Sequence, residues 1–475
     1  MSTVTSTAEL RVVAIADADS FVKWSASLLS GIAGIRRHML LVRTPLTVSA
    51  AQERTALAGT SFADADVTRL GFDELHGWLT GHQPDVVVLS GRGPFVRLMA
   101  RQIDRLAQRP VVVSGLPGMS IPAQRGALEY RRESDLMVVH SHREERAFAE
   151  LGRRIGIQVP TALAVLPFAQ MASDAVTAGP GRVVERELVG AVAGRGSGAV
   201  TGRAAGTARR AGAPITSAGG TDLVFAAQAL VPAARHEREQ IAEMLRLAAD
   251  AEPTKRVVVK LRSRPGEAEA HLERDAYADL LAARPANLVI SHEPMSSALA
   301  RAEGLVTVSS TAAIEALAQK VPVIALDTFG VHKTLLNTVF TGSGLLGGAE
   351  EVVARRFRHP LAGWQRDNYF QPESDTNWWR CVEELVALRR EGRLRAKAVP
   401  VGRGGALHAA WHRKSVLAGE DRSVIGRVAL GVGAPLVIGI LSMRRARGQA
   451  GEDTWSDATT DYTLEPTPLH DPIRR

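Results

Sequence analysis

Hydrophobic residues in the first third of the chain form short continuous runs that are separated by amphipathic stretches. The runs are rich in Val, Ile and Leu and predict strands buried on both faces, at 11–15, 38–43, 85–89, 110–114 and 136–141. Apolar positions at helical spacing predict helices between them, at 21–31, 72–77, 91–106 and 143–151. This alternation is typical of a parallel sheet that is covered by helices on both sides.

The same alternation begins again near residue 223. Strands are predicted at 223–227, 256–260, 287–290, 305–308 and 322–326, and helices at 236–249, 267–282, 311–319 and 375–394. We therefore predict an α/β fold with two Rossmann-like parallel-sheet domains that face a central cleft. Ligands of open α/β sheets bind beyond the carboxyl ends of the strands, so we expect the functional residues at those ends.

Composition places the boundaries between these parts. We expect one α/β domain at 10–170, a second at 221–345, and closing helices that pack across both domains at 346–397. Residues 171–220 are rich in Gly, Ala and Arg and contain no aromatic residue, so they predict a disordered linker, with an Ala-rich helix near 183–192 as the alternative. The tail at 398–475 is basic and apolar and then acidic, and we expect it to be largely irregular.

Charge and cysteine content exclude several classes of protein. The 475 residues include 58 Lys and Arg against 50 Asp and Glu, a formal net charge of +8 that is not concentrated in a stripe with aromatic residues. Nucleic acid is therefore not an expected partner. The single cysteine, Cys381, excludes an internal disulfide framework and a Cys-based zinc site. The first residues lack the pattern of a secretory signal, which favours a cytoplasmic protein.

Four well-known motifs are missing from the sequence. There is no G-x-G-x-x-G after the first predicted strand, no G-x-x-x-x-G-K-[ST], no H-E-x-x-H and no G-x-S-x-G. These absences argue against dehydrogenases, P-loop NTPases, zinc proteases and α/β-hydrolases. An enzyme that uses a nucleotide-activated sugar remains, as does a periplasmic-type binding protein, which the lack of a secretory signal disfavours.

The sharpest candidate site is the hydroxyl-rich turn after the strand at 305–308. Ser309, Ser310 and Thr311 stand where the next helix begins, and we expect free amide groups and the helix dipole there to hold a phosphate. One hydroxyl would indicate ordinary capping, but three in a row at a strand end favour a ligand site. Glu315 on the same helix and Gln228 after another strand are further candidates for the cleft.

A second candidate site follows the strand at 256–260. Lys260, Arg262 and Arg264 alternate along the chain, and extended geometry places them on one side, as exposed cations at the carboxyl end of the strand. An ammonium group and guanidinium forks suit a diphosphate, whereas a solvated basic loop is the alternative. Glu267 and His271 on the following helix are weaker candidates, because a lone helical His is more often structural.

A third candidate site lies at the end of the first strand, where four polar side chains fall within seven residues. They are Asp17, Asp19, Ser20 and Lys23. A carboxylate here could accept the proton of a hydroxyl substrate, whereas the alternative is that Asp19 or Ser20 is a plain helix N-cap. Arg92, in a glycine-containing turn at another strand end, is also a candidate. We expect no metal site, since the Asp-x-Asp motif at 17–19 does not lie near the basic and hydroxyl motifs.

These motifs resemble those of GT-B glycosyltransferases. The second half is similar to bacterial capsule-polysaccharide transferases and CDP-glycerol glycerophosphotransferases. Those enzymes carry a Lys-x-His-Pro type segment after one strand and a Ser-Ser/Thr turn followed by a Pro-containing strand. Lys260-Leu-Arg262-Ser stands in the first position, and Ser309-Ser310-Thr311 with Val321-Pro322-Val323 matches the second. The first strand also ends in an Asp-x-Asp-Ser-x-x-Lys-Trp run similar to that of an uncharacterised group of bacterial glycosyltransferases.

The resemblance implies a metal-independent glycosyltransferase that needs no cofactor. It would move a sugar from a nucleotide sugar to a glycan or lipid-linked acceptor of the cell envelope or a surface polymer. The first domain would then bind the acceptor, with Asp17 or Asp19 as the base. The second would bind the donor phosphates through Lys260, Arg262 and residues 309–311. Arg262 replaces the His of the related motif, which leaves the donor's identity open.

Three other functions remain possible on this scaffold. They are a polyol-phosphate transferase, a sugar-nucleotide epimerase and a non-catalytic binding protein of a surface-polymer assembly system. The uncharged run at 428–443 bears on location, because basic residues flank it. It is too short and too interrupted by Gly and Pro to span a bilayer, so it predicts peripheral contact with the inner face of the membrane. A buried core helix or a disordered tail is the alternative.

Overall fold

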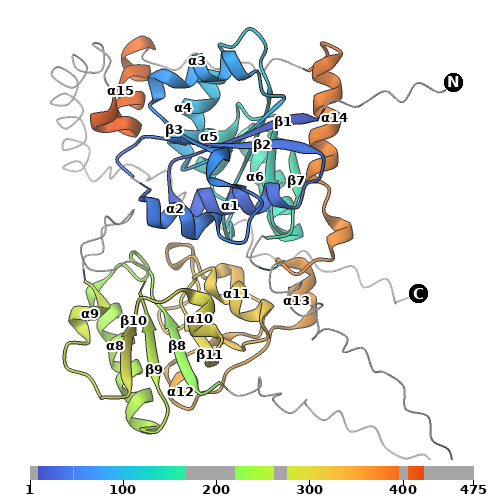
Figure 1. Cartoon of the computed structure of the whole chain (residues 1–475). Helices are drawn as coiled ribbons and strands as arrows, with labels where there is room; N and C mark the ends of the chain where they lie inside the picture. The colour runs from blue at the N-terminus through green and yellow to red at the C-terminus, as the bar shows by residue number, and fades with distance from the viewer. Residues whose placement is uncertain are drawn as a thin grey trace, which may run out of the picture.

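The computed structural model describes residues 9–46, 48–166, 169, 220–261, 275–394 and 405–421. The linker predicted at 171–220 lies outside the described residues except for Gly220, and so does the apolar run at 428–443. Two domains with parallel sheets make up the described molecule, one drawn above the other in Figure 1. No helix among the described residues is long and apolar enough to cross a membrane.

The first domain is built on a seven-stranded sheet with the order β3-β2-β1-β4-β5-β6-β7, in which neighbouring strands run parallel. The strands are β1 (Leu10–Ala16), β2 (Ile35–Val42), β3 (Val67–Leu70), β4 (Val86–Ser90), β5 (Val111–Gly115), β6 (Leu136–Val139) and β7 (Thr161–Leu163). The helices between them are α1 (Asp19–Ser30), α2 (Ala50–Leu57), α3 (Phe72–His82), α4 (Gly93–Ile103), α5 (Arg125–Arg131) and α6 (His142–Ile155).

The second domain has a six-stranded sheet with the order β10-β9-β8-β11-β12-β13, again with parallel neighbours. The strands are β8 (Asp222–Ala226), β9 (Val257–Lys260), β10 (Leu288–Ser291), β11 (Ala302–Thr307), β12 (Val323–Leu326) and β13 (Leu346–Gly347). Its helices are α8 (Arg235–Ala251), α9 (Tyr277–Leu280), α10 (Met295–Leu299), α11 (Ala312–Ala318) and α12 (Ala349–Val353). The predicted fold class, two Rossmann-like parallel-sheet domains, is confirmed.

Helices cover both faces of the first sheet, which explains why its strands are continuously apolar. Along β1, Val12 and Ala14 belong to a core that includes α1, whereas Val13 and Ile15 belong to a core on the opposite face with α3 and α4. Side chains alternate between the two faces of a strand, so a strand covered on both faces must be apolar at every position.

The C-terminal segment crosses from the second domain back to the first. After α13 (Ala362–Asp367), the helix α14 (Trp378–Arg390) contacts β5, β6 and β7, and it lies beside the first sheet in Figure 1. Trp378, Val382 and Val386 are buried there in the same core as α1. The helix predicted at 375–394 thus starts later than expected, because 373–375 forms a separate 3₁₀ turn.

The tail at 398–475 was expected to be largely irregular, but the part of it that the structure describes, residues 405–421, is mostly helical. Residues 405–417 form the helix α15 (Gly405–Leu417), which packs against α4. Its last turn buries Val416 and Leu417 in the core of the first domain, and Arg413 forms an ion pair with Asp421. This helix was not predicted, because docking of its last turn and this ion pair hold it, rather than a regular apolar stripe that the sequence would reveal.

The two domains are in direct contact at the ends of their sheets. One hydrophobic cluster contains residues of both, including Ile121 and Leu128 from the first domain and Ala312 and Phe340 from the second. At Gly118, in the loop after β5, an added Cβ would lie 2.7 Å from the Thr311 methyl group of the second domain. A larger residue at this position would therefore force Thr311 or the domains to shift.

Candidate active site

Each sheet has one point at which its strand order reverses, and the candidate residues gather at these two points. In the first sheet, β1 pairs with both β2 and β4; in the second, β8 pairs with both β9 and β11. In open α/β sheets, the loops on the two sides of such a switch point run in opposite directions, and ligands bind between them at the carboxyl ends of the strands. Asp17 and Arg92 flank the first switch point, and Gln228 and Ser309 flank the second.

Asp17 directly follows β1 and is 2% exposed. Neither carboxylate oxygen has a hydrogen-bond partner from another residue in the described part of the chain. Burial raises the pKa of Asp17 to about 6, while the charge of Arg92 and the residue's own amide oppose this shift. A buried carboxylate whose oxygens have no hydrogen-bond partner from another described residue, and whose pKa lies just below neutral, is suited to accept a proton from a hydroxyl group.

The other polar residues of this motif begin α1. Ala18 is the N-cap and Asp19 is the first helical residue, so the alternative that Asp19 or Ser20 caps the helix is wrong. Lys23, one turn further on, acts electrostatically across the domain boundary on Glu315 of α11. Burial raises the pKa of Glu315, and the Lys23 ammonium group opposes that shift. The two halves of the predicted site therefore approach each other here.

The hydroxyl-rich turn lies at the end of β11, as predicted, but several of its amides are already bonded. The Ser309 amide donates to Gln228 Oε1 (2.9 Å), and Gln228 Nε2 donates to Ser309 Oγ (3.2 Å). The amides of Ser310 and Ala312 donate to the hydroxyl oxygens of Thr307 and Ser310 (both 3.2 Å). The expectation of free amides is therefore wrong at these three positions, because nearby side-chain oxygens accept their hydrogen bonds.

Thr311 and Lys260 complete the described part of the second crevice. Thr311 is the N-cap of α11 and makes no side-chain capping bond, and its methyl group packs over Gly118. Lys260 ends β9, paired in register with Ala226 of β8, and it is 8% exposed rather than the exposed cation that we expected. Its ammonium group donates to the backbone oxygen of Leu261.

The remaining basic motif residues lie outside the described residues. They are Arg262, Arg264, Glu267 and His271. Of the alternating cations, the structure therefore places only Lys260, and the predicted common orientation stays a prediction.

Two buried arginines that the sequence analysis did not select organise the loops at the strand ends. Arg238 on α8, 2% exposed, donates to the backbone oxygen of Gln228 (3.0 Å) and stacks over the Tyr277 ring at 4.3 Å. Arg131 on α5 donates to the backbone oxygens of Gly115 (3.3 Å) and Gly91 (3.2 Å), and burial lowers its pKa to about 10. Arg238 continues the apolar stripe of its helix, a pattern that could have revealed it.

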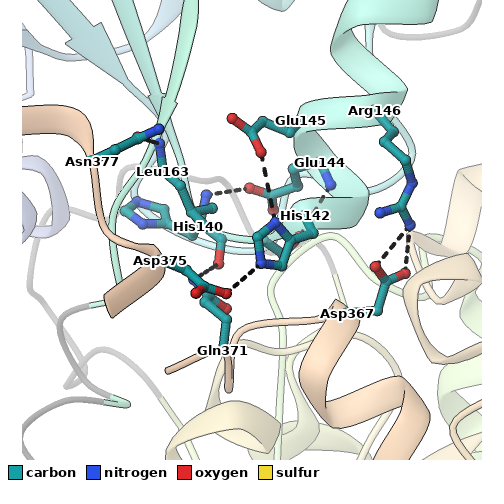
Figure 2. A network of polar contacts seen from close by, with 11 residues as sticks. His140, His142, Glu144, Glu145, Arg146, Leu163, Asp367, Gln371, Asp375 and Asn377 are labelled. Carbon is teal, nitrogen blue, oxygen red and sulfur yellow. Dashed lines mark hydrogen bonds and ion pairs between the residues drawn. The ribbon is translucent and has the colours of Figure 1, made fainter. Parts of the chain in front are cut away.

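A network of polar contacts joins the first domain to residues 362–390, which we call the crossing segment (Figure 2). The sequence analysis did not select the residues of this network. Glu144 at the start of α6 is fully buried. Its Oε1 accepts from the Ser120 amide and the Tyr369 hydroxyl, and its Oε2 accepts from the His140 amide, each at 2.7 Å. Burial raises the pKa of Glu144 to about 7, and the three hydrogen bonds oppose that shift.

Further contacts surround this carboxylate in Figure 2. Gln371 Nε2 donates to the His140 backbone oxygen (3.0 Å), His142 contacts Asp375 (2.8 Å), and Arg146 donates to both oxygens of Asp367 (2.7 and 2.8 Å).

The His140 ring has a structural role. Trp24 Nε1 donates to His140 Nε2 (2.7 Å), so Nδ1 carries the proton and donates to the Ala164 oxygen (2.9 Å). Burial lowers the pKa of His140 to about 4, which keeps the ring neutral.

Within the described ranges, no group of three or more His, Cys, Asp and Glu side chains is arranged to hold a metal ion. Among the described residues, the first domain contributes a buried carboxylate, Asp17, to the candidate site. The second domain contributes a cluster of hydroxyl, amide and ammonium groups.

Two Rossmann-like domains, each with one switch point in its parallel sheet, define a GT-B-like glycosyltransferase architecture. Over residues 12–385 the chain matches the family described as "Putative glycosyltransferase (DUF6716)", and it belongs to this family. The expected resemblance to glycosyltransferases is thereby confirmed, whereas the similarity to capsule-polysaccharide and CDP-glycerol enzymes stays a prediction. A comparison with curated proteins finds no match.

Solved structures show only distant similarity. A UDP-GlcNAc 2-epimerase from Methanocaldococcus jannaschii, in complex with UDP-GlcNAc and UDP, is 14% identical with a TM-score of 0.49, over 79% of this chain and 100% of its own. A UDP-GlcNAc 2-epimerase from Neisseria meningitidis, bound to UDP-GlcNAc, is 9% identical with a TM-score of 0.46, over 79% and 100%. A ugt transferase from Siraitia grosvenorii, in complex with UDP, is 11% identical with a TM-score of 0.37, over 86% and 99%. Because these identities are below 25% and the TM-scores are below 0.5, the ligands of these proteins do not indicate what this chain binds.

Proposed function

We propose that this chain is a metal-independent glycosyltransferase that moves a sugar from a nucleotide-activated donor to a hydroxyl group of an acceptor. The observation that carries the proposal is Asp17, a buried carboxylate at the switch point of the first sheet whose two oxygens have no hydrogen-bond partner among the described residues. Family membership supports the reaction class. A site shared by both domains is supported by the contact between Gly118 and Thr311 and by the electrostatic effect of Lys23 on Glu315.

In this proposal Asp17 takes the proton of the acceptor hydroxyl as the new glycosidic bond forms. The nearby charge of Arg92 favours the ionised form of Asp17, so the base is available near neutral pH. General-base assistance of this kind contributes about 10²- to 10⁴-fold in rate. Asp19, more exposed at the start of α1, is the weaker candidate for the same role.

The donor diphosphate would bind at the second switch point. Negative charge grows on the leaving phosphate during transfer, and fixed donors stabilise it without a metal ion. Lys260 supplies an ammonium group at the end of β9, and Ser309, Ser310 and Thr311 supply hydroxyl groups at the end of β11. The Gln228 side chain forms hydrogen bonds with both the backbone amide and the hydroxyl group of Ser309, so this part of the proposed site is preorganised. Arg262 would add a second cation.

The acceptor in this proposal belongs to the cell envelope or a surface polymer, as a glycan or a lipid-linked molecule. The resemblance of the strand-end motifs to capsule-type transferases supports it. Peripheral contact with the inner face of the membrane would bring the enzyme to a lipid-linked acceptor.

A panel of UDP-, GDP-, CDP- and CMP-sugars tests the reaction class. The purified chain is incubated with each donor and a mixture of envelope glycans, with and without EDTA, and the released nucleotide is measured. We expect release with one nucleotide class, dependent on acceptor and insensitive to EDTA. Conversion of the sugar without acceptor would indicate an epimerase. Binding without turnover would indicate a binding protein. Either result would contradict the proposal.

The donor-phosphate assignment predicts a loss of binding in Lys260→Met, which keeps the buried stem and removes the charge. A charge-assisted hydrogen bond is worth roughly 1.5–3 kcal/mol, so the nucleotide affinity should fall about 10- to 150-fold. The matched control is Lys255→Met, since Lys255 precedes the same strand and pairs with Glu303 away from the crevice. Titration calorimetry with the nucleotide from the panel measures both, and equal affinities in the two variants would refute the assignment.

A further inference from the structure

We propose that Glu144 is a positioning residue of the transfer reaction, which couples the crossing segment to the loop that contacts the donor half of the site. Its carboxylate holds Tyr369 of that segment and Ser120 of the loop after β5. The catalytic meaning of this coupling rests on the proposed function, whereas the coupling itself does not.

The hydrogen bonds to Glu144 come from three separate parts of the chain. Ser120 lies in the loop after β5, His140 at the end of β6, and Tyr369 in the crossing segment 225 residues away. The carboxylate is fully buried, as is the Tyr369 side chain. Hydrogen bonds to an ionised, buried carboxylate are short and strong. Removal of one donor therefore leaves part of the buried charge without a hydrogen bond, which weakens the whole arrangement.

The loop after β5 carries this connection to the donor half. The Ser120 hydroxyl donates to the Gly118 backbone oxygen at 3.2 Å, which links the residue that Glu144 holds to the residue that meets Thr311. An added Cβ at Gly118 would lie 2.7 Å from the Thr311 methyl group, so the two surfaces are already in close contact. A shift of Ser120 therefore changes the distance between the acceptor and donor halves.

The backbone of the crossing segment is held in an uncommon conformation at Tyr369. Its φ of 65° lies in the left-handed region, which is unfavourable for a residue with a bulky side chain. The burial of the ring and the hydrogen bond to Glu144 hold Tyr369 in this conformation. Loss of the hydroxyl should therefore release the segment locally, without removal of the packed ring.

Two other polar links attach the same segment to α6 and supply a matched control. Arg146 binds Asp367 through both carboxylate oxygens, and His142 contacts Asp375. Both links are at least partly exposed, and no contact from either to the loop after β5 is found among the described residues. Arg146→Gln thus weakens the docking of the segment without touching Ser120.

Hydrogen exchange of the full-length chain tests the coupling directly. Tyr369→Phe and Glu144→Gln should raise the amide exchange rates of the non-proline residues in 116–121 several-fold, beginning with Ser120, and those of residues 309–313 to a smaller extent. Arg146→Gln should raise exchange around 362–368 and leave 116–121 unchanged. Unchanged loop exchange in Tyr369→Phe, or an equal effect of Arg146→Gln on the loop, would overturn the proposal.

Kinetics then test whether this coupling matters for transfer. Misplacement of reacting groups by fractions of an ångström lowers turnover more than ground-state binding. We therefore expect Tyr369→Phe to lower kcat about tenfold while the nucleotide affinity and the KM for the donor change less than twofold. Altered exchange with unaltered kcat would remove the positioning role. Absence of any transferase activity in the wild type would instead refute the proposed function and leave the coupling in place.

Discussion

Asp17 and Glu144 show how the surroundings of a buried carboxylate decide what it can do. Burial raises the pKa of each, to about 6 and about 7. Glu144 accepts three hydrogen bonds from other segments, which occupy its oxygens and fix its position. Asp17 accepts none from another described residue, and it lies directly after β1, where the strand order of the first sheet reverses. The first arrangement suits a structural link and the second suits a base.

The pKa of Asp17 predicts the pH dependence of the reaction. A base must be ionised, so kcat/KM should fall about tenfold per pH unit below about pH 6 and level off above it. An aspartate with the ordinary pKa of 3.8 would keep kcat/KM constant down to about pH 5. Initial rates from pH 4.5 to 8, with the donor from the panel, measure this profile. A rate that stays constant across pH 5–7 would contradict the role of Asp17 as the base.

Residues at strand ends could be selected from the sequence because strand ends follow from the hydrophobic pattern. Asp17, Gln228 and Ser309 all lie where the predicted strands stop. Glu144 and Arg131 could not be selected in this way. The main partners of Glu144 include a tyrosine 225 residues away, and Arg131 binds backbone oxygens at two other strand ends. Only the tertiary fold brings such groups together.

Among the elements, α14 stabilises the first domain although it follows the second in the chain. Trp378 is 3% exposed and lies in the core that α1 and the first sheet form. The first domain is therefore complete only when the crossing segment has docked.

This arrangement predicts a large effect of a C-terminal substitution on N-terminal stability. Trp378→Ala should lower the free energy of unfolding of the first domain by about 3–5 kcal/mol, the usual cost of truncating a buried aromatic side chain. Urea unfolding, followed by hydrogen exchange of β5 and β6, measures the effect. The control is Arg380→Ala on the same helix, an exposed residue paired with Glu384, which should change little. Equal stability of the two variants would show that α14 does not belong to this core.

Long, fully buried strands and amphipathic helices could be predicted, whereas short or weakly patterned elements could not. The strands β7 and β13 contain only three and two residues, too few for a clear pattern, and β3 buries only one of its four residues. Of the helix predicted at 267–282, the described part contains only α9, at Tyr277–Leu280. The docked helix α15 was also missed, because its stability comes from contacts of its last turn.

At the scale of the whole molecule, the contact between the two domains determines whether the proposed site is assembled. Three features lie at that contact: Gly118 against Thr311, the electrostatic effect of Lys23 on Glu315, and the crossing segment held by Glu144. The sequence predicted two domains but not their closeness, since no local pattern encodes a distance between separately folded units.

Gly118→Ala tests whether this closeness matters. The added methyl group would lie 2.7 Å from the Thr311 methyl group, so either Thr311 rotates or the domains separate slightly. We expect kcat to fall roughly tenfold with little change in stability. Gly77→Ala is the control, because nothing lies within 4 Å of an added Cβ there. Steady-state kinetics and thermal unfolding of both variants give the answer, and an unchanged kcat in Gly118→Ala would argue against a site shared across this contact.

The central claim is that Asp17 is the base of a sugar transfer at the meeting point of the two domains. The most direct test compares Asp17→Asn with the wild type and with Asp250→Asn, which alters an exposed aspartate at the end of α8. The measurement is kcat for acceptor-dependent nucleotide release, together with the nucleotide affinity. The account predicts a 10²- to 10⁴-fold lower kcat in Asp17→Asn, unchanged affinity, and normal values for Asp250→Asn. A kcat for Asp17→Asn within threefold of the wild type would contradict it.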